Sequence, residues 1–154
     1  MKVLLMQHGK PVPEAEDPAR PLSEQGRREV QAVARFLKGT GTILGEILHS
    51  GKTRARETAD LVASAMDLSI MPREERGLSP LDDVREIAQR IADMEHNILI
   101  CGHLPHLGKL TSLLVTGEES FDLARFQQGG VLCLERGNPK EWVIAWMIVP
   151  GILG

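Results

Sequence analysis

Three short apolar runs, at residues 2–6, 43–49 and 97–101, constrain the fold of this chain most strongly. Each run is largely continuous rather than alternating between apolar and polar residues, which is typical of a strand buried on both faces of a parallel sheet. Polar residues or glycines follow each run, and the segments between the runs show helical spacing of apolar residues. The sequence therefore predicts an α/β domain in which strands and helices alternate.

The segments around these runs predict four helices. Ser23 is a good N-cap for the first helix, Ser50 begins the second, and Pro105 suits the first turn of the fourth. The residues expected to face the core recur at helical spacing. They are Val30, Val33, Ala34 and Leu37 in the first helix, Leu61, Val62, Ala65 and Met66 in the second, Val84, Ile87, Ala88 and Ile91 in the third, and Leu107, Leu110, Leu113 and Leu114 in the fourth.

Two further strands are predicted near the C-terminus, at residues 131–135 and 142–149, with a turn over residues 136–140 between them. Alternating strands and helices followed by such a hairpin predict a three-layer α/β/α sandwich with a mostly parallel central sheet and one antiparallel strand. A chain of 154 residues, 42% of them hydrophobic, can bury one substantial core. We therefore expect a single domain over residues 1–154.

The net charge and the two cysteines limit which binding partners and which cellular compartment we expect. The formal net charge is −3 and the isoelectric point is near 6.0, so we expect neither nucleic acid nor an anionic membrane as a partner. Cys101 and Cys133 lie within apolar runs, which indicates reduced core thiols rather than a disulfide. The first apolar run is too short for a signal peptide or a membrane span. We expect a cytoplasmic protein.

The residues that follow the predicted strands are the candidates for function. In an open α/β sheet, ligands bind outside the carboxyl ends of the strands. Residues 7–9 (Gln-His-Gly), 50–54 (Ser-Gly-Lys-Thr-Arg) and 102–106 (Gly-His-Leu-Pro-His) would bring two histidines and a group of cations to one edge of the sheet. Gly9 and Gly102, one beside each histidine, allow close approach of the backbone to a ligand. The pattern indicates an anion site with a nucleophile or acid-base group in it.

Four motifs occur in order along nearly the whole chain. They are Met6-Gln7-His8-Gly9, Arg20-Pro21-Leu22-Ser23 with Gly26, Leu48-His49-Ser50 with Arg54-Ala55 and Thr58, and Gly102-His103 with Pro105-His106. Together they resemble the motifs of the histidine phosphatase superfamily, also called the phosphoglycerate mutase-like family, and within it the small SixA-type phosphohistidine phosphatases.

The resemblance implies that His8 is phosphorylated during turnover, that Arg54 and His103 hold the transferring phosphoryl group, and that Arg20 lines the pocket. It implies a phosphatase without a metal or cofactor, acting on phosphohistidine in a partner protein. The chemistry of these residues agrees, because a neutral imidazole with a reference pKa of about 6.5 is largely free to attack at neutral pH. Nearby cations can compensate the charge on the phosphoryl oxygens.

One residue departs from the family pattern. Gln7 stands where the first motif has arginine, which removes a fixed cation and its forked donors from the predicted phosphate site. Gln7 can still donate a hydrogen bond, and with Gly9 we assign it to substrate binding. Loss of a charge-assisted contact costs about 1.5–3 kcal/mol. The alternative function is therefore a phosphate- or phosphohistidine-binding module with weak or lost turnover.

The general acid has no recognisable motif. Glu74, Glu75, Asp82 and Asp83 are available, but surface charge, or for Asp82 a helix cap, is the competing interpretation of each. A phosphorylated imidazole is a much better leaving group than an alkoxide, so it depends less on an acid. The absence of a confident acid thus favours phosphohistidine over sugar phosphates as the substrate.

Two other enzyme classes fit the spacing less well. The Gly-Lys-Thr of residues 51–53 ends like a nucleotide-binding loop, but that motif requires a glycine at the position of Glu46. His8, His103 and His106 are the candidates for a metal hydrolase, yet the His-x-x-His spacing lacks the glutamate of the zinc motif and contains Pro105. We therefore expect no bound metal.

Overall fold

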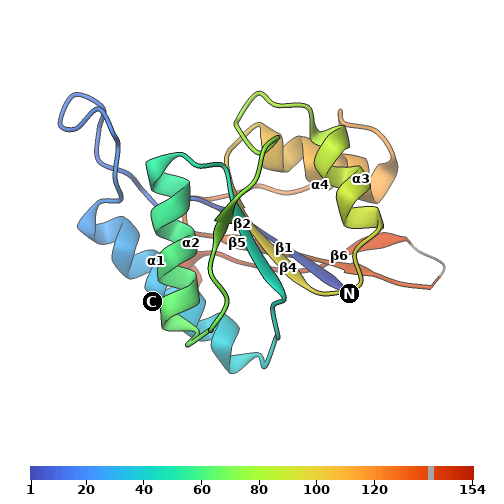
Figure 1. The fold of residues 1–154 in the computed structure, drawn as a ribbon, viewed down its shortest axis with the longest axis horizontal. Helices are drawn as coiled ribbons and strands as arrows, with labels where there is room; N and C mark the ends of the chain where they lie inside the picture. Colours follow the sequence, from blue (N-terminus) through green and yellow to red (C-terminus); the bar gives the residue numbers. More distant parts are fainter. Residues whose placement is uncertain (139–140) are drawn as a thin grey trace.

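A computed structural model of the chain describes residues 1–138 and 141–154 (Figure 1). Its strands are β1 (Lys2–Gln7), β2 (Glu46–His49), β3 (Arg73–Glu74), β4 (Ile98–Gly102), β5 (Val131–Arg136) and β6 (Trp142–Ile148). Its helices are α1 (Glu24–Gly39), α2 (Thr53–Ala65), α3 (Val84–Ala92), α4 (His106–Thr116) and the short 3₁₀ helix η1 (Pro150–Ile152). Part of the turn predicted over residues 136–140 lies outside the described residues, because Pro139 and Lys140 are not among them.

The six strands form one sheet in the order β3-β2-β4-β1-β5-β6. The pairs β1 with β4, β4 with β2 and β2 with β3 are parallel, whereas β5 runs antiparallel to both β1 and β6. The carboxyl ends of β1, β2 and β4 consequently meet at one edge. The prediction of a mostly parallel sheet with one antiparallel strand is confirmed.

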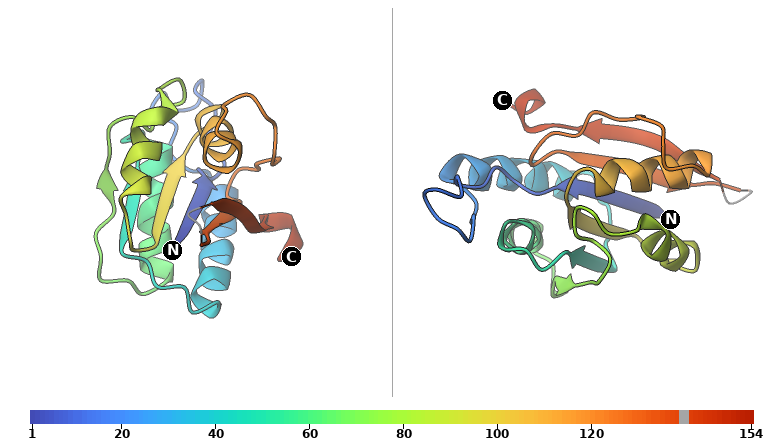
Figure 2. Two further views of the ribbon diagram at one scale, coloured as in Figure 1. Left: turned by 90° about the vertical axis from the view of Figure 1, so that its right-hand side faces the viewer. Right: turned by 90° about the horizontal axis from the view of Figure 1, so that it is seen from above.

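Helices cover both faces of the sheet. Helices α1 and α2 lie on one side and α3 and α4 on the other (Figures 1 and 2). Successive side chains of a strand point to opposite faces, so Leu4 and Met6 of β1 pack toward α1 and α2, while Val3 and Leu5 pack toward α3 and α4. All four side chains are fully buried. This confirms the three-layer sandwich and explains why β1 is continuously apolar.

Strand β2 and helix α2 begin later than predicted. Ile43 is 81% exposed and the Gly45 N–H donates to the Asn97 carbonyl, so the ladder of β2 starts only at Glu46. The chain then turns at Gly51, whose φ is +89°, and α2 starts at Thr53 rather than Ser50. A left-handed φ of this kind is readily adopted only by glycine, which accounts for the delay.

The buried face of α2 also differs from the prediction. Val62 and Met66 are buried as expected, but Leu61 and Ala65 are only half-buried. Small residues make up the rest of the buried face, namely Ala55, Thr58, Ala59 and Ala63. Because small side chains allow close approach of the backbone, α2 packs tightly against α1 and the sheet. Strand β3, which pairs only at two polar residues, offered no apolar pattern from which to predict it.

The start of α1 anchors the loop that follows β1. The Ser23 hydroxyl accepts from the Gly26 N–H at 3.0 Å and donates to the Lys10 carbonyl at 2.9 Å. A Cβ on Gly26 would lie 2.2 Å from that same carbonyl oxygen, so the helix and the loop are in direct backbone contact. The predicted N-cap at Ser23 is confirmed, and it fixes the chain just after His8.

Two further expectations concern the thiols and the membrane. Cys101 and Cys133 are buried free thiols, as predicted. Burial raises the pKa of both, that of Cys133 to about 11, so neither is a reactive thiolate at neutral pH. Among the described residues, we find no helix with the length and apolar character needed to cross a bilayer.

Candidate active site

His8 lies directly after β1 at the carboxyl edge of the sheet. Its backbone N–H donates to the Gly102 carbonyl at 3.0 Å, which ties it to the end of β4. Its ring Nδ1 lies 2.8 Å from the Gly9 carbonyl oxygen. A carbonyl can only accept, so Nδ1 carries the hydrogen and Nε2 retains a lone pair. The hydrogen bond thus orients the ring with Nε2 as the nucleophilic atom.

The surroundings of His8 keep its imidazole neutral. Burial lowers its pKa, the hydrogen bond to Gly9 opposes this, and the positive charges of Arg54 and Arg20 lower it further, to about 4 in all. A neutral imidazole is the form that can attack phosphorus. His8 is therefore in its nucleophilic state throughout the neutral range.

His103 follows β4 and faces His8 across the edge of the sheet. The two ring centroids are 5.1 Å apart and the planes are tilted by 50°. Burial, followed by the charges of His8 and Arg54, lowers the pKa of His103 to about 3. Its Nε2 lies 2.6 Å from the Ser50 hydroxyl, whereas its buried Nδ1 has no hydrogen-bond partner among the described residues. The ring can thus offer a donor to a ligand.

Two guanidinium groups complete the site. Arg54 lies in the first turn of α2 and Arg20 in the loop before α1, and each lowers the pKa of His8 by its charge. Burial and the charge of Arg20 lower the pKa of Arg54 as well. The Nε atoms of both are buried, and no residue in the described ranges accepts a hydrogen bond from them. Two neighbouring positive charges without a hydrogen-bond acceptor raise the free energy of the ligand-free protein, and an anion bound between them would lower it.

Arg20 occupies an uncommon backbone conformation. Its φ is +48°, in the left-handed region that a residue with a side chain rarely adopts. Such strain persists where the surrounding structure imposes it, and it is frequent at ligand sites. The Arg20 N–H donates to the Asp17 carbonyl at 2.9 Å, which holds this turn. The loop thereby directs a second cation to His8 from outside the sheet.

We refer to His8, Arg20, Arg54 and His103 as the phosphoryl pocket. All four were predicted from the sequence as catalytic or substrate-binding residues, and the structure brings them together. Their roles in catalysis stay predictions.

Gln7 and Gly9 were assigned to substrate binding, and both flank His8. The Gln7 side chain is partly buried, and its Oε1 finds no hydrogen-bond donor in the described part of the chain. At Gly9, a Cβ would lie 2.8 Å from Val30 Cγ2, so packing against α1 already requires glycine there. A Cβ on Gly102 would lie 3.1 Å from Leu107 Cδ2, at the end of a side chain that can move. Packing against α1 therefore accounts for Gly9, and the contact of Gly9 with substrate stays a prediction.

Two residues that the sequence analysis named in the third motif, without assigning either a catalytic or binding role, join the pocket together. Thr58, fully buried on α2, accepts from the Gly9 N–H at 3.0 Å and donates to the Arg54 carbonyl at 2.7 Å. Ser50 contacts His103. Thr58 thus links the nucleophile loop to the helix that carries Arg54. Its place four residues after Arg54, one helical turn, was the signal that could have identified it.

The four candidate acids line a separate cavity of about 330 Å³ that also includes Ser50. Three of them have structural partners among the described residues. Glu75 forms ion pairs with Arg73 and Arg90, Asp82 accepts from the Ser79 N–H, and Asp83 caps α3. The cap that the sequence suggested at Asp82 is therefore formed by Asp83.

Glu74 is the remaining candidate acid. Its carboxylate lies against the turn after β2, where a Cβ on Gly51 would be 2.4 Å from Glu74 Oε1. The side chain is exposed. Among the described residues, none of the four candidate acids belongs to the phosphoryl pocket, so the general acid stays unassigned.

The three histidines considered for a metal hydrolase are not arranged as a set of ligands. His106 is fully buried and its Nε2 donates to the Gly77 carbonyl at 2.7 Å, so it holds the loop before α3. Within residues 1–138 and 141–154, no three histidine, cysteine or acidic side chains are grouped in a way that could hold a metal ion.

The model of the histidine phosphatase superfamily (branch 1) matches residues 3–82, which include His8, Arg20 and Arg54. The chain belongs to this superfamily. The resemblance to this superfamily that was inferred from the motifs is confirmed.

Known relatives support the same placement. Phosphohistidine phosphatase SixA of Escherichia coli K12 is 29% identical over 123 residues, which cover 77% of this chain and 76% of that protein. A solved structure of the protein histidine phosphatase SixA complexed with tungstate superposes with a TM-score of 0.87 at 25% identity, over 100% of both chains.

The fold alone also matches a more distant enzyme. A mycobacterial glucosyl-3-phosphoglycerate phosphatase superposes with a TM-score of 0.71 at 14% identity, over 94% of this chain and 97% of that one. The substrate must therefore be argued from the site.

Proposed function

We propose that this protein is a phosphohistidine phosphatase that acts through a phosphohistidine intermediate on His8. In the first step, His8 Nε2 attacks phosphorus, the P–N bond to the substrate imidazole breaks, and that imidazole takes up a proton from solvent. In the second step, water attacks phosphorus and releases a proton to solvent, the bond to Nε2 breaks, and inorganic phosphate leaves. The observation that carries the proposal is the Nδ1–H of His8 bound to the Gly9 carbonyl, which leaves Nε2 unprotonated beside two guanidinium groups.

The other pocket residues stabilise the charge that develops during transfer. Arg54 and Arg20 both have buried donors without an acceptor in the described residues, so they are prepared to bind phosphoryl oxygens. A preorganised donor stabilises the transition state without the cost of reorganisation. His103 contributes a further donor from the other histidine motif. No step of this chemistry requires a metal ion.

Phosphohistidine is the proposed substrate because the four candidate acids line another cavity and, among the described residues, none of them belongs to the phosphoryl pocket. Hydrolysis of an alkyl phosphate must expel an alkoxide, which is a poor leaving group. Phosphohistidine instead expels its imidazole, which leaves readily with little proton donation. The similarity to SixA supports the same substrate class. We further propose a single domain over residues 1–154, since both core clusters pack on one sheet, and a reducing, cytoplasmic setting for its buried free thiols.

A second candidate function rests on Gln7. With glutamine in place of the family arginine, the pocket has one cation fewer, and phosphate binding would be weaker. The protein could then bind phosphohistidine with weak or no turnover. The fold and pocket would be the same, so measurement must separate the two functions.

Side-by-side kinetics test the proposal. We expect kcat/KM for a phosphohistidine peptide or phosphoramidate to exceed that for small sugar phosphates by at least about tenfold, equivalent to about 1.4 kcal/mol. Activity should survive chelators, and acid-labile phosphate should appear on wild-type protein but not on the His8→Ala variant. Equal rates for the two substrate classes would contradict the substrate, and unchanged turnover in folded His8→Ala would contradict the nucleophile. Phosphohistidine binding without turnover would establish the second function.

A further inference from the structure

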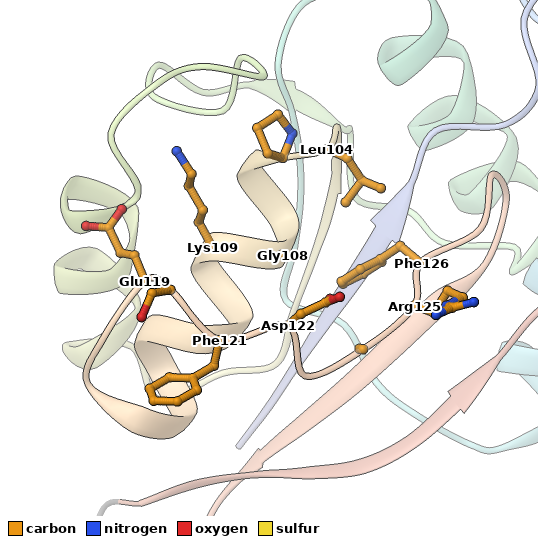
Figure 3. Close-up of a pocket in the computed structure, with 11 residues that line it drawn as sticks. Leu104, Gly108, Lys109, Glu119, Phe121, Asp122, Arg125 and Phe126 are labelled. Atoms are coloured by element: carbon orange, nitrogen blue, oxygen red, sulfur yellow. The ribbon is translucent and has the colours of Figure 1, made fainter.

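A groove lies beside His103, outside the phosphoryl pocket. It has a volume of about 360 Å³ and runs between the first turns of α4 and the loop at residues 119–126 (Figure 3). Leu104 lines it and follows His103 directly in the chain. The groove therefore begins at the residue after His103, beside the carboxyl end of β4.

The groove presents apolar surface in a concave position. Leu104 is 42% exposed and Phe121 is 50% exposed, and both line the groove together with the buried ring of Phe126. Gly108 of α4 also lines it, and a Cβ added there would meet no atom within 4 Å. The space above Gly108 is thus open, and its apolar wall would favour burial of an apolar side chain.

Charged side chains accompany this apolar surface. Lys109 and Arg125 carry positive charge, and Glu119 and Asp122 carry negative charge (Figure 3). Within the described part of the chain, none of the four forms an ion pair by contact of side-chain atoms. An apolar centre with a polar, solvent-accessible rim is the usual anatomy of a protein-binding surface. A small phosphorylated metabolite, polar and anionic, would gain little from it.

We propose that this groove binds the polypeptide segment that carries the phosphohistidine, with an apolar side chain of that segment inserted between α4 and the loop at residues 119–126. This inference rests on the proposed function, because it presumes that the phosphorylated residue belongs to a protein. It adds a specificity site to the reaction: the pocket accepts the phosphoryl group, and the groove selects the chain around it.

The geometry limits where the inserted side chain can be. From Pro105 to Lys109, α4 extends about 6 Å at 1.5 Å per residue. An extended chain covers this distance in about two residues, and a helix covers it in about one turn. Because Leu104 lines the groove and directly follows His103, the apolar residue should lie within about four residues of the phosphohistidine.

A peptide series with matched variants tests the groove. Leucine, or serine as its control, is placed one to four residues before or after the phosphohistidine, and kcat/KM is measured for each pair. Gly108→Leu fills the groove, and Gly39→Leu makes the same change at a helical glycine of α1 that also has no atom within 4 Å of an added Cβ. Phosphoramidate, which has no flanking chain, reports the chemistry alone.

For the wild type, we expect at least one leucine peptide to be preferred over its serine control by about tenfold. Gly108→Leu should abolish the preference and leave phosphoramidate turnover unchanged, whereas Gly39→Leu should keep both. Phe121→Ser should weaken the preference in the same direction. No preference at any position, or a preference that survives in Gly108→Leu, would overturn the proposal.

A binding measurement tests the groove even if the protein has no phosphatase activity. If the wild type hydrolyses neither the peptides nor phosphoramidate, the proposed phosphatase activity is wrong. Fluorescence anisotropy of the same peptides, carrying a stable phosphohistidine analogue, then decides whether the groove selects the leucine peptide. Equal affinities for the leucine and serine peptides at every position would overturn the groove assignment by itself.

Discussion

Two groups of charged residues in this protein differ in whether side chains of opposite charge contact their arginines. In the phosphoryl pocket, burial and the charge of Arg20 lower the pKa of Arg54. In the β2–β3 charge network, defined as Glu46, Arg73, Glu75, Arg90 and His96, each arginine contacts a carboxylate. There, the hydrogen bond that Arg73 donates to Glu46 raises the pKa of Arg73. The arginines of the β2–β3 charge network thus have carboxylate partners within the protein, whereas those of the phosphoryl pocket are available to a ligand.

The difference shows which charges stabilise the fold and which serve a ligand. Although burial raises the pKa of Glu46, its contacts with Arg73 and Arg90 lower it overall, so its ionised form favours the folded state. The cations of the phosphoryl pocket repel one another instead. A site of this kind reduces stability and increases binding of an anion, which is the usual trade-off at functional sites.

The largest expected effect separates the two groups directly. Arg54→Gln should lower kcat/KM for phosphohistidine by about a hundredfold, since a charge-assisted contact to the phosphoryl group is lost. Arg73→Gln should change kcat/KM less than about twofold and lower the free energy of unfolding by up to about 1 kcal/mol. Steady-state kinetics and urea unfolding measure both quantities for each variant. A loss of activity in Arg73→Gln as large as that in Arg54→Gln would remove the distinction.

A smaller effect is expected when a cation is added to the pocket. Gln7→Arg should raise kcat/KM or tighten inorganic phosphate binding by about tenfold, because it restores a forked donor beside His8. The added charge should also lower the stability of the ligand-free protein. Gln89→Arg, on the exposed face of α3, introduces the same charge away from the pocket and should alter neither quantity. If Gln7→Arg folds and leaves phosphate affinity and activity unchanged, Gln7 does not contact the phosphoryl group.

The smallest effect concerns pH. With its pKa lowered to about 4, His8 should remain neutral between pH 7.5 and 5.5, where a free histidine would become mostly protonated. Nuclear magnetic resonance of the imidazole nitrogens, assigned with His8→Asn, should show no titration in this range. A midpoint near 6.5 would contradict the described burial.

The same pKa shifts predict how stability depends on pH. The pKa values of His8 and His103 are lower in the folded than in the unfolded protein, so the unfolded chain binds more protons between about pH 4 and 6.5. The free energy of unfolding should therefore fall as pH falls through this window. His8→Asn should reduce that dependence, since its side chain does not titrate.

The fold followed from local patterns wherever an element is apolar. The continuous run of β1 and the amphipathic spacing of α1 predicted their positions closely. The pattern failed at β3, whose two residues are both polar, and at the start of α2, which the turn at Gly51 delays. A two-residue polar strand and a glycine turn leave no apolar periodicity from which to predict them.

The candidate site followed from the sequence to a similar extent. Topology alone places His8 and His103 together, because both follow buried parallel strands, and the family motifs indicate Arg20 and Arg54. Spacing did not show that Glu75 and Asp83 are engaged by neighbouring groups, or that Gly9 is required by α1. These facts depend on side-chain packing between distant elements.

The place of β1 in the sheet has a consequence for biosynthesis. Strand β1 lies between β4 and β5, so it is synthesised before both of its neighbours, which begin only at Ile98 and Val131. Loop closure over such distances is slow and must precede the contacts that reward it. The nascent chain therefore cannot assemble His8 beside His103 until β4 has emerged, and β1 depends on β5 to cover its second edge. Premature release of the polypeptide would yield no partially active enzyme, and the unpaired apolar N-terminal strand would be a substrate for chaperones.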